Sequence, residues 1–495
     1  MSKIIIQNGN MCELDLPLKF AQKLYNEFAI RHPNAFYLRT RQRGMQNWDG
    51  KIHYITKTGQ FKIGLLPKVY DMCIEMGIKP KVVDMRQPLP KVSKVVTKIG
   101  KYKLRPEQEK AVKAVINNTI GGKPFHIGVL DYTVNAGKTL IMSSLYLSYK
   151  KQLKTLLITN DSDWLNQARE EFKQYLPGED ITFVQGKVLN WSNFTIGMVQ
   201  SISRNMRFYQ KELSQIDMVL IDEADQGGSR QYQNVITRLF NTRIRIGLSG
   251  TIYMSKLAKD KVKNMNLECF FGKVLAEFKL RDSIKKGYST KTVVKMVPGK
   301  PWYGNWESDC ISYKEIYDDS ITNSYTAWLM AYSRLRWNIN QGRYPALVVC
   351  KHIAHCENLY KFFKKKLGDA YNIAYVHVNT KSKLRQQIMK DFRDGKIDIL
   401  VSTTIIARGK NFPKLRYLLN AASMDSQEKS IQFLGRLVRT DKSKKKVYLD
   451  DLHYPGPYLD RHGKHRKQYY QRQELKVILL DKLWKKHPNH SLIKS

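Results

Sequence analysis

The sequence predicts an α/β protein in which two successive parallel-sheet domains follow a small α+β domain at the N-terminus. Its 495 residues are too many for one hydrophobic core. Short, continuous apolar runs alternate with longer helical patterns between residues 101 and 284, and again after the aromatic segment at 299–306. Buried strands separated by helices are typical of parallel sheets covered on both faces. Two such series in one chain indicate two domains of the same class.

The first 95 residues carry short strand and helix signals of their own. They end in the polar, proline-containing stretch DMRQPLPKVSK at residues 84–94. Proline and polar residues in such a cluster mark a linker. We therefore expect a separate accessory domain over residues 1–95.

The two apolar series give the boundaries of the two larger domains. We expect the first over residues 96–284, from the runs HIGVL (126–130), TLLIT (155–159), FTIGMV (194–199), MVLID (218–222) and IRIGLSG (244–250). We expect the second over residues 285–453, from the runs ALVVC (346–350), IAYVHV (373–378), IDILVST (397–403), YLLNAA (417–422) and KKVYLDD (445–451). Residues 454–495 are basic and aromatic and form a predicted C-terminal extension.

The charge balance is the outlier of the composition. Lys and Arg number 85 against 43 Asp and Glu, a formal net charge of +42. The 42% of hydrophobic residues is normal for a globular chain and excludes a mostly disordered one. A surplus of this size predicts a polyanionic partner, with nucleic acid as the expected one. The alternative is a basic but otherwise ordinary protein.

The composition also bears on location. No run approaches the roughly 18 apolar residues of a membrane helix, and the start, MSKIIIQNGNMCELDLPLKF, lacks the pattern of a signal peptide. The six cysteines are scattered, as in a protein with reduced thiols. We expect a cytoplasmic protein.

A candidate phosphate-binding loop follows the first apolar run. The residues Asn135, Ala136, Gly137, Lys138 and Thr139 stand between a predicted strand and a predicted helix. Small residues there let backbone N–H groups surround phosphates at the helix start. Lys138 would reach the β- and γ-phosphates of ATP, and the Thr139 hydroxyl would bind Mg²⁺. The first position of the usual pattern, ordinarily Gly, is here Tyr132.

An acidic pair ends the fourth apolar run. Asp222 and Glu223 belong to the string MVLIDEAD, and carboxylates at the tip of a parallel strand lie beside the crevice where such sheets bind ligands. Asp222 is a candidate Mg²⁺ ligand, and Glu223 is the candidate base that orients and deprotonates the attacking water. The alternative, a solvated acidic turn, does not explain the preceding phosphate loop.

Two further segments would complete this site. The segment LRPEQ opens a helix, and it supplies the candidate ATP contacts Arg105 and Gln108. The carboxamide of Gln108 could pair with N6 and N7 of adenine, although LRPEQ is also a good helix start. The segment GLSGT places the hydroxyls of Ser249 and Thr251 after another strand, near the acidic pair, where they would couple the site to motion.

The second α/β domain contributes the string QFLGRLVR, in which Gln432, Arg436 and Arg439 are candidate catalytic residues. Arg436 and Arg439 are three apart and are expected on one helical face. A guanidinium suits the charge spread over a transferring phosphoryl group. Without the phosphate loop, two surface arginines would be the simpler interpretation.

The motifs LRPEQ, AGKT, LLITNDSDWLNQ, TIGMVQSIS, DEAD, LSGT, VCKH, VSTTIIARGKNFP and QFLGRLVR occur in this order between residues 100 and 450. In this order they resemble the superfamily 2 helicases and translocases, and the resemblance implies two tandem RecA-like motor domains that use ATP and Mg²⁺. The sequence departs from the DEAD-box RNA helicases at LSGT, at the segment TNDSDWLNQ, and at Gln432, where His is usual. It is closer to the duplex-DNA translocases.

The resemblance also implies roles in binding nucleic acid. Thr159, Gln200, Ser201 and Thr403 would contact one strand's phosphate backbone without reading sequence. Arg408 would couple that track to ATP, and Gly409 would contact the nucleotide. Asn411 replaces a common Asp, so the ribose contact expected there is in doubt.

The segment RQRGMQNWDGK at residues 41–51 resembles the basic Trp-Asp-Gly segment of the UvsW-type branch-migration helicases of phages. Arg41, Arg43, Trp48 and Lys51 would then contact phosphates and stack on unpaired bases. The alternative is a hairpin turn that serves packing only.

Two further segments are candidates for DNA contact. The aromatic residues at 302–306 are either a strand-separating wedge or a packing loop. The basic stretch at 461–472 is either an electrostatic arm or a solvated helix.

The sequence as a whole predicts an ATP- and Mg²⁺-dependent DNA helicase or translocase. Its substrates would be branched or forked DNA and single-strand/duplex junctions, and its reactions fork regression and Holliday-junction branch migration in recombination, repair and replication restart. We expect a monomer, in the host cytoplasm if a bacteriophage encodes it. The alternatives are an RNA helicase and a non-unwinding subunit that translocates on duplex DNA.

Overall fold

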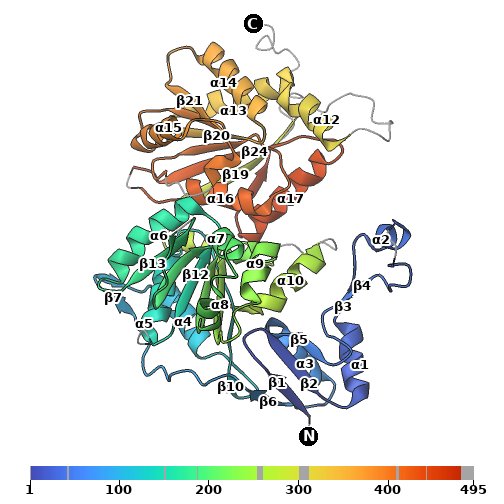
Figure 1. The fold of residues 1–495 in the computed structure, drawn as a ribbon. Coiled ribbons are helices and arrows are strands. Elements are labelled where there is room, and N and C mark those ends of the chain that lie inside the picture. Colours follow the sequence, from blue (N-terminus) through green and yellow to red (C-terminus); the bar gives the residue numbers. More distant parts are fainter. Residues whose placement is uncertain are drawn as a thin grey trace. The chain divides into compact units, whose positions relative to one another are not determined.

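The computed structural model describes residues 2–41, 44–149, 152–186, 188–253, 260–299, 312–407, 412–441 and 443–480. The chain divides into two compact units, Met1–Phe278 and Lys279–Ser495, which are described separately (Figure 1). The domain boundaries predicted from the sequence, after residues 95, 284 and 453, stay predictions. Among the described residues, no helix combines the length and the apolar character needed to span a membrane.

The N-terminal region contains a small four-stranded sheet of order β5-β2-β1-β6. Strand β2 pairs antiparallel with both β1 and β5, and β1 pairs parallel with β6. Strands β5 and β6 therefore run in the same direction, and a helix connects them. A separate two-stranded ribbon, β3–β4, carries a short helix. The elements are β1 (Lys3–Ile6), β2 (Met11–Asp15), α1 (Leu18–Glu27), β3 (Ala29–Arg31), α2 (Ala35–Arg41), β4 (Lys51–His53), β5 (Gln60–Lys62), η1 (Ile63–Leu65), α3 (Leu66–Glu75) and β6 (Lys81–Asp84).

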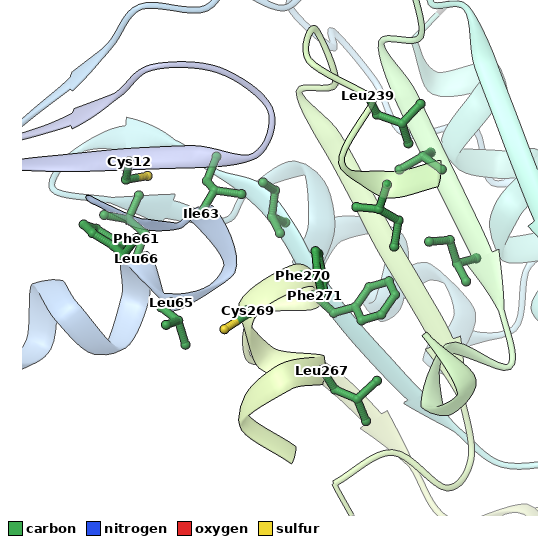
Figure 2. Close-up of a cluster of buried hydrophobic side chains, with 14 of the residues drawn as sticks. Cys12, Phe61, Ile63, Leu65, Leu66, Leu239, Leu267, Cys269, Phe270 and Phe271 are labelled. Atoms are coloured by element: carbon green, nitrogen blue, oxygen red, sulfur yellow. The ribbon is translucent and has the colours of Figure 1, made fainter. Parts of the chain in front are cut away.

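This region shares one hydrophobic core with the parallel sheet that follows it. Leu65 lies beside Cys269 in Figure 2, and both belong to one continuous cluster of buried side chains. A Cβ on Gly64 would lie 2.1 Å from the carbonyl oxygen of Glu268, so only glycine allows this approach. The fully buried guanidinium of Arg245 donates to the carbonyl oxygen of Gly9 at 2.6 Å. The first 95 residues are therefore packed into the first unit.

The parallel sheet of the first unit has the order β14-β13-β15-β12-β16-β17-β11-β18. Only the edge strand β14 runs antiparallel to its neighbour. Every residue of β11, β12, β15, β16 and β17 is buried, which confirms the apolar runs as strands of a covered sheet. The strands are β11 (His126–Tyr132), β12 (Thr155–Thr159), β13 (Ile181–Gln185), β14 (Val188–Leu189), β15 (Phe194–Met198), β16 (Met218–Asp222), β17 (Ile244–Ser249) and β18 (Val274–Phe278).

Helices cover this sheet, and short hairpins precede and follow the first of them (Figure 1). The helices are α4 (Pro106–Ile116), α5 (Lys138–Ser148), α6 (Ser162–Tyr175), α7 (Val199–Arg204), α8 (Gln210–Ser214), η2 (Ala224–Gln226), α9 (Arg230–Ile236) and α10 (Lys261–Phe271). The hairpins pair β7 (Lys98–Ile99) with β8 (Tyr102–Lys103) and β9 (Thr119–Ile120) with β10 (Lys123–Pro124).

The second unit contains an all-parallel sheet of order β21-β22-β20-β23-β24-β19-β25. Its strands are β19 (Lys291–Pro298), β20 (Ala346–Cys350), β21 (Ile373–Val376), β22 (Ile399–Thr403), β23 (Tyr417–Asn420), β24 (Lys446–His453) and β25 (Val477–Leu479). Its helices are α11 (Leu280–Lys285), α12 (Tyr313–Tyr317), η4 (Asp318–Thr322), α13 (Tyr325–Ile339), α14 (Ile353–Leu367), α15 (Ser382–Asp394), η5 (Thr404–Ala407), α16 (Gln427–Leu437) and α17 (Leu459–Arg472). The predicted fold class, tandem RecA-like sheets behind a small N-terminal sheet, is confirmed.

Helix α17 differs from the electrostatic arm expected over residues 461–472. The guanidinium of Arg466 is fully buried and donates to Asp451 on β24 at 2.9 Å. The hydroxyl of Tyr470 donates to the same carboxylate at 2.8 Å, and His465 contacts Asp425 at 2.9 Å. A buried carboxylate needs such partners, because an unpaired buried charge is costly. One face of α17 therefore belongs to the core of the second unit, and Arg461 and Lys464 remain exposed.

Candidate functional site

The candidate phosphate-binding loop lies between a fully buried strand and a helix. Strand β11 ends at Tyr132 and α5 begins at Lys138. The turn uses two residues with positive φ, Asn135 at 63° and Gly137 at 72°. A Cβ on Gly137 would lie 2.3 Å from Nε2 of Gln108, so this position requires glycine. The loop thus leads into a helix N-terminus, an arrangement suited to binding phosphates.

Lys138 and Asp222 form the charged centre of the site. Nζ of Lys138 lies 3.4 Å from Oδ1 of Asp222, the last residue of the buried strand β16. Burial by itself lowers the pKa of Lys138, but the carboxylates of Asp222, Glu223 and Asp225 outweigh it and raise this pKa above its usual value. Lys138 therefore stays cationic, as a ligand for anionic phosphates must.

The oxygen atoms of Asp222 and Thr139 are a donor set suited to Mg²⁺. Oδ1 of Asp222 is buried, and within the described part of the chain its contact is the ion pair with Nζ of Lys138, with no further hydrogen bond. Thr139 directly follows Lys138 and is half-buried. Mg²⁺ prefers few protein oxygen ligands and completes its coordination with water and substrate phosphates. The two residues fit the ion, and their role as its ligands stays a prediction.

The acidic segment after β16 is linked to the strand beside it. Glu223, the predicted base, has a φ of 53°, a left-handed conformation that is uncommon outside glycine. Asp225 accepts a hydrogen bond from Oγ of Ser249 at 2.8 Å, and that Oγ lies 3.1 Å from Oγ1 of Thr251. Ser249 thus joins Thr251 to Asp225, a residue that sequence reasoning did not single out. Its only signal was its place as the last letter of DEAD.

Gly250 brings this segment close to the phosphate loop. A Cβ at position 250 would lie 3.1 Å from both the Cα of Thr133 and the carbonyl oxygen of Tyr132. The glycine of LSGT therefore allows a tight approach between the end of β17 and the end of β11.

Gln108 makes its hydrogen bonds with backbone groups of the loop and of its own helix start. Its Nε2 donates to the carbonyl oxygen of Ala136 at 2.8 Å, and its Oε1 accepts from the backbone N–H of Arg105 at 2.8 Å. The side chain of Arg105 reaches the carbonyl oxygen of Asn135 at 3.5 Å. Both residues therefore lie at the loop, while their roles as ATP contacts and the pairing of Gln108 with adenine stay predictions.

Tyr132, the departure from the usual loop pattern, has a structural role. Its ring is fully buried, and its hydroxyl donates to the carbonyl oxygen of Glu107 at 2.7 Å. Burial raises the pKa of this hydroxyl, so it stays protonated and able to donate. The side chain joins the end of β11 to the start of α4.

The predicted nucleic-acid contacts of the first unit lie at the ends of β12 and β15. Thr159 is almost fully buried and its Oγ1 accepts from the N–H of Asp161 at 3.2 Å. Oγ of Ser201 accepts from the N–H of Gly186 at 3.0 Å. Gln200 is half-buried and is the second residue of α7, after Val199. Their roles as DNA contacts stay predictions.

A polar connection that the sequence did not reveal joins this region to the acidic segment. Nε2 of Gln200 donates to the carbonyl oxygen of Asn160 at 3.4 Å, and the Asn160 side chain is hydrogen-bonded to Gln226 at the end of η2. The segment that carries Glu223 is therefore linked to the start of α7 through Asn160, which contacts the side chains of both Gln226 and Gln200. Polar residues at the ends of neighbouring parallel strands were the available signal.

In the second unit, Gln432 and Arg436 lie on α16, and both are half-buried. Arg439 is not on the same helical face as expected, because α16 ends at Leu437. The chain is held there by Thr290, whose N–H donates to the carbonyl oxygen of Val438 and whose Oγ1 donates to that of Arg439. Thr403 ends β22 and is buried. Arg408, Gly409 and Asn411 lie outside the described residues.

The Trp-Asp-Gly segment forms the end of the β3–β4 ribbon. The indole Nε1 of Trp48 donates to the carbonyl oxygen of Lys51 at 2.9 Å, and its ring meets His32 edge-on. Arg41 and Lys51 are exposed. Arg43 and the aromatic residues at 302–306 lie outside the described residues. The DNA contacts predicted for this segment stay predictions.

Two family models match the chain, one in each unit. The model described as "Type III restriction enzyme, res subunit" matches residues 101–254, and "Helicase conserved C-terminal domain" matches residues 331–441. The first match contains the phosphate loop and the acidic segment. The second contains α16 with Arg436, and Arg439 beyond the end of that helix.

Curated relatives are similar at low identity. The putative ATP-dependent helicase IRC3 of Saccharomyces cerevisiae is 24% identical over 377 residues, which cover 70% of this chain and 51% of that protein. The ATP-dependent DNA helicase uvsW of Enterobacteria phage T4 is 21% identical over 435 residues, 82% of each chain. The ATP-dependent RNA helicase CHR1 of Candida albicans is 23% identical over 231 residues, 46% of this chain and 33% of that protein. The chain spans about half the length of IRC3.

Solved structures with TM-scores above 0.5 share the fold, and one further match has a lower score. A fragment of a putative HsdR subunit of a type I restriction enzyme from Vibrio vulnificus has a TM-score of 0.57 at 14% identity, over 87% of this chain and 78% of that one. Dbp5 of S. cerevisiae, bound to RNA, has a TM-score of 0.52 at 13% identity, over 79% of this chain and 93% of that one. T4 UvsW has a TM-score of 0.44 at 18% identity, over 97% and 98%.

Proposed function

The chain belongs to the ATP-dependent superfamily 2 helicases, and from this premise we propose that it remodels branched DNA. The proposed reactions are fork regression and Holliday-junction branch migration in recombination, repair and replication restart. The similarity to T4 uvsW carries this proposal, because it extends over 82% of both chains. The Trp-Asp-Gly segment at residues 41–51 supports it.

The first unit supplies the groups that bind and cleave ATP in this proposal. Lys138 neutralises the β- and γ-phosphates from its place 3.4 Å from Asp222. Glu223 orients the attacking water and takes its proton. A magnesium ion held by Thr139 and Asp222 would neutralise charge that develops on the phosphates.

The second unit supplies guanidinium groups in the same proposal. Arg436 and Arg439 would stabilise the negative charge of the transferring phosphoryl group. Because these residues belong to a different compact unit from Lys138, binding and hydrolysis of ATP would change how the units engage each other. Repeated cycles would move the chain along one DNA strand.

The link through Gln226, Asn160 and Gln200 supports a path from ATP to DNA. One end of this path lies beside the acidic segment, and the other lies at the start of α7 next to Ser201. Thr159 and Thr403 would complete the contacts to phosphates in the two units. Uncharged donors there would allow movement without preference for sequence.

ATP hydrolysis and strand displacement by the purified chain test this function. We expect forked DNA and four-way junctions to stimulate hydrolysis more than linear duplex, with strand displacement that requires ATP. Binding should weaken steeply with salt, because much of the surplus positive charge would contact phosphates. Equal activity on linear duplex and branched DNA would contradict the proposed substrate.

An RNA helicase is a second candidate, since RNA helicases such as CHR1 are among the relatives. Stronger stimulation of hydrolysis by RNA than by forked DNA would favour it. A translocating subunit without unwinding activity is the third candidate, supported by the restriction-enzyme family model over residues 101–254. Hydrolysis stimulated by duplex DNA without strand displacement would favour that function.

A further inference from the structure

Helix α2 presents two aromatic side chains to solvent. Phe36 is 81% exposed and Tyr37 is 53% exposed. Figure 1 shows α2 at the end of the β3–β4 ribbon, away from the four-stranded sheet of the same region. A fully exposed phenylalanine contributes nothing to the core, and neighbouring exposed aromatic residues often mark a binding surface.

Side-chain contacts stabilise the β3–β4 ribbon next to α2. Trp48 donates to the carbonyl oxygen of Lys51 at 2.9 Å, and the ring of His53 stacks on Tyr25 with centroids 4.1 Å apart. Gly50 has a φ of 78°, and a Cβ there would lie 3.1 Å from Cβ of Ala35, the buried first residue of α2. Gly50 thus lies against the first residue of α2, the helix that carries the two exposed aromatic rings.

The charges around these rings are almost all positive. Residues 29–53 contain five Lys and Arg residues and a single carboxylate, that of Asp49. Asp49 is hydrogen-bonded to His53 at 2.7 Å and to the N–H of Lys51 at 2.9 Å, and these two bonds lower its pKa. Its carboxylate therefore already has partners within the ribbon.

Two observations on the placement of these cations favour an anionic partner. Arg31 and Lys51 are direct cross-strand partners in the β3–β4 ribbon, and both are exposed. Like charges in such a pair destabilise a sheet unless a counter-charge lies between them. On α2, the guanidinium of Arg41 lies 4.8 Å from the centre of the Tyr37 ring, which leaves its charge beside an aromatic face.

We propose that Phe36 and Tyr37 stack on unpaired bases of the DNA substrate, while Arg31, Arg41 and Lys51 contact the adjoining phosphates. Aromatic faces combined with cations bind single-stranded nucleic acid, because every base offers a π-face and every linkage a negative charge. The surplus of positive charge favours this occupant over an apolar protein surface. The inference rests on the proposed function, since it identifies the part of a branched substrate that this region binds.

The test compares Phe36→Ala with Leu18→Ala in the full chain. Leu18 is a matched control, because it lies on α1 in the same region and is 80% exposed. The probe is a DNA fork with single-stranded arms that carry 2-aminopurine, and fully paired duplex is the comparison. Phe36→Ala should weaken binding to the fork between about fivefold and a hundredfold and reduce the fluorescence change on binding, with duplex binding unchanged. Leu18→Ala should change neither.

The dependence on salt separates stacking from charge. Phe36→Ala should keep the slope of binding affinity against salt, whereas Arg41→Gln should reduce it by roughly 0.7 to 0.9 per lost phosphate contact. Equal weakening of fork and duplex by Phe36→Ala, or no weakening of either, would overturn the inference. If the unaltered chain unwinds forks while Phe36→Ala behaves like Leu18→Ala, only this inference fails. If the unaltered chain neither binds forks nor hydrolyses ATP in response to them, the proposed function fails.

Discussion

The side-chain amide of Gln108 donates a hydrogen bond to the main-chain oxygen of Ala136 at 2.8 Å. Gln108 lies in the first turn of α4 and is 1% exposed, and Ala136 lies in the middle of the phosphate loop. The loop is therefore braced by the residue that was expected to recognise adenine. The hydrogen bond to Ala136 and the predicted contact with adenine would both use the side-chain amide of Gln108. The two roles therefore predict different effects of substituting this residue.

As a brace, Gln108 should stabilise the first unit without nucleotide. Gln108→Ala leaves the Ala136 carbonyl unpaired in a buried place, so the free energy of unfolding should fall by about 1–3 kcal/mol. Urea unfolding monitored without ATP measures this, with the exposed Gln210→Ala on α8 as control. Unchanged stability together with a loss of preference for ATP over GTP would instead assign Gln108 to adenine alone.

Lys138→Ala should abolish ATP hydrolysis and leave salt-sensitive DNA binding in place. It should also destabilise the first unit by about 3–5 kcal/mol, because the buried Asp222 carboxylate loses its partner. The double variant Lys138→Ala/Asp222→Asn should recover much of that stability but no activity. Hydrolysis stimulated by DNA in Lys138→Ala would contradict the proposed mechanism. The exposed Lys113→Ala on α4 is the control for stability, with an expected change within about 1 kcal/mol.

Arg466→Met should destabilise the second unit by about 3–5 kcal/mol. Both Arg466 and Asp451 are fully buried, so the substitution leaves the Asp451 carboxylate without its cationic partner. Lys464→Ala on the exposed face of the same helix should change stability by less than about 1 kcal/mol. Denaturant unfolding of the two variants compares them. Equal effects would mean that α17 is not part of the core of this unit.

Acid should destabilise the second unit through His355. Its ring is buried on α14, and burial, followed by the nearby His352, lowers its pKa to about 3. The unfolded chain, with an ordinary histidine pKa near 6.5, binds this proton more readily, so the free energy of unfolding falls as pH drops from about 6.5 towards 3. At pH 5 the loss should be about 2 kcal/mol relative to pH 7. His355→Gln should remove that part of the pH dependence, and an unchanged difference between pH 7 and pH 5 would contradict it.

The phosphate loop and the acidic strand were predictable because their chemistry is local. A buried strand, small loop residues and a helix start follow one another within the segment from His126 to Ser148, and the pattern needs no distant partner. The same holds for β16, where a continuous apolar run leads directly to Asp222. The two parallel sheets followed from the same kind of local pattern.

The structure placed several other residues differently from their local appearance. Gln108 has the pattern of a helix start, yet its partner Ala136 lies 28 positions away. Arg439 follows Arg436 at helical spacing, yet α16 ends at Leu437 and the carbonyl oxygen of Arg439 accepts a hydrogen bond from the Thr290 hydroxyl. Trp48 belongs to a segment predicted to stack on bases, and its indole N–H donates a hydrogen bond to the carbonyl oxygen of Lys51. Each of these outcomes depends on a partner that the local pattern does not contain.

Local pattern was thus sufficient to predict the fold class and the strand–loop–helix geometry of the candidate phosphate-binding loop, and composition was sufficient to predict a polyanionic partner from the charge of +42. Which cations remain available to that partner depended on long-range packing. Arg245 lies between Phe270 and the turn at Gly9, and Arg466 is enclosed with Asp451, so neither can contact a ligand in solution. Arg31, Arg41 and Lys51 remain exposed around α2. The reason is physical: a guanidinium is buried only where distant carbonyl and carboxylate groups converge to satisfy it, and that convergence exists only in the folded chain.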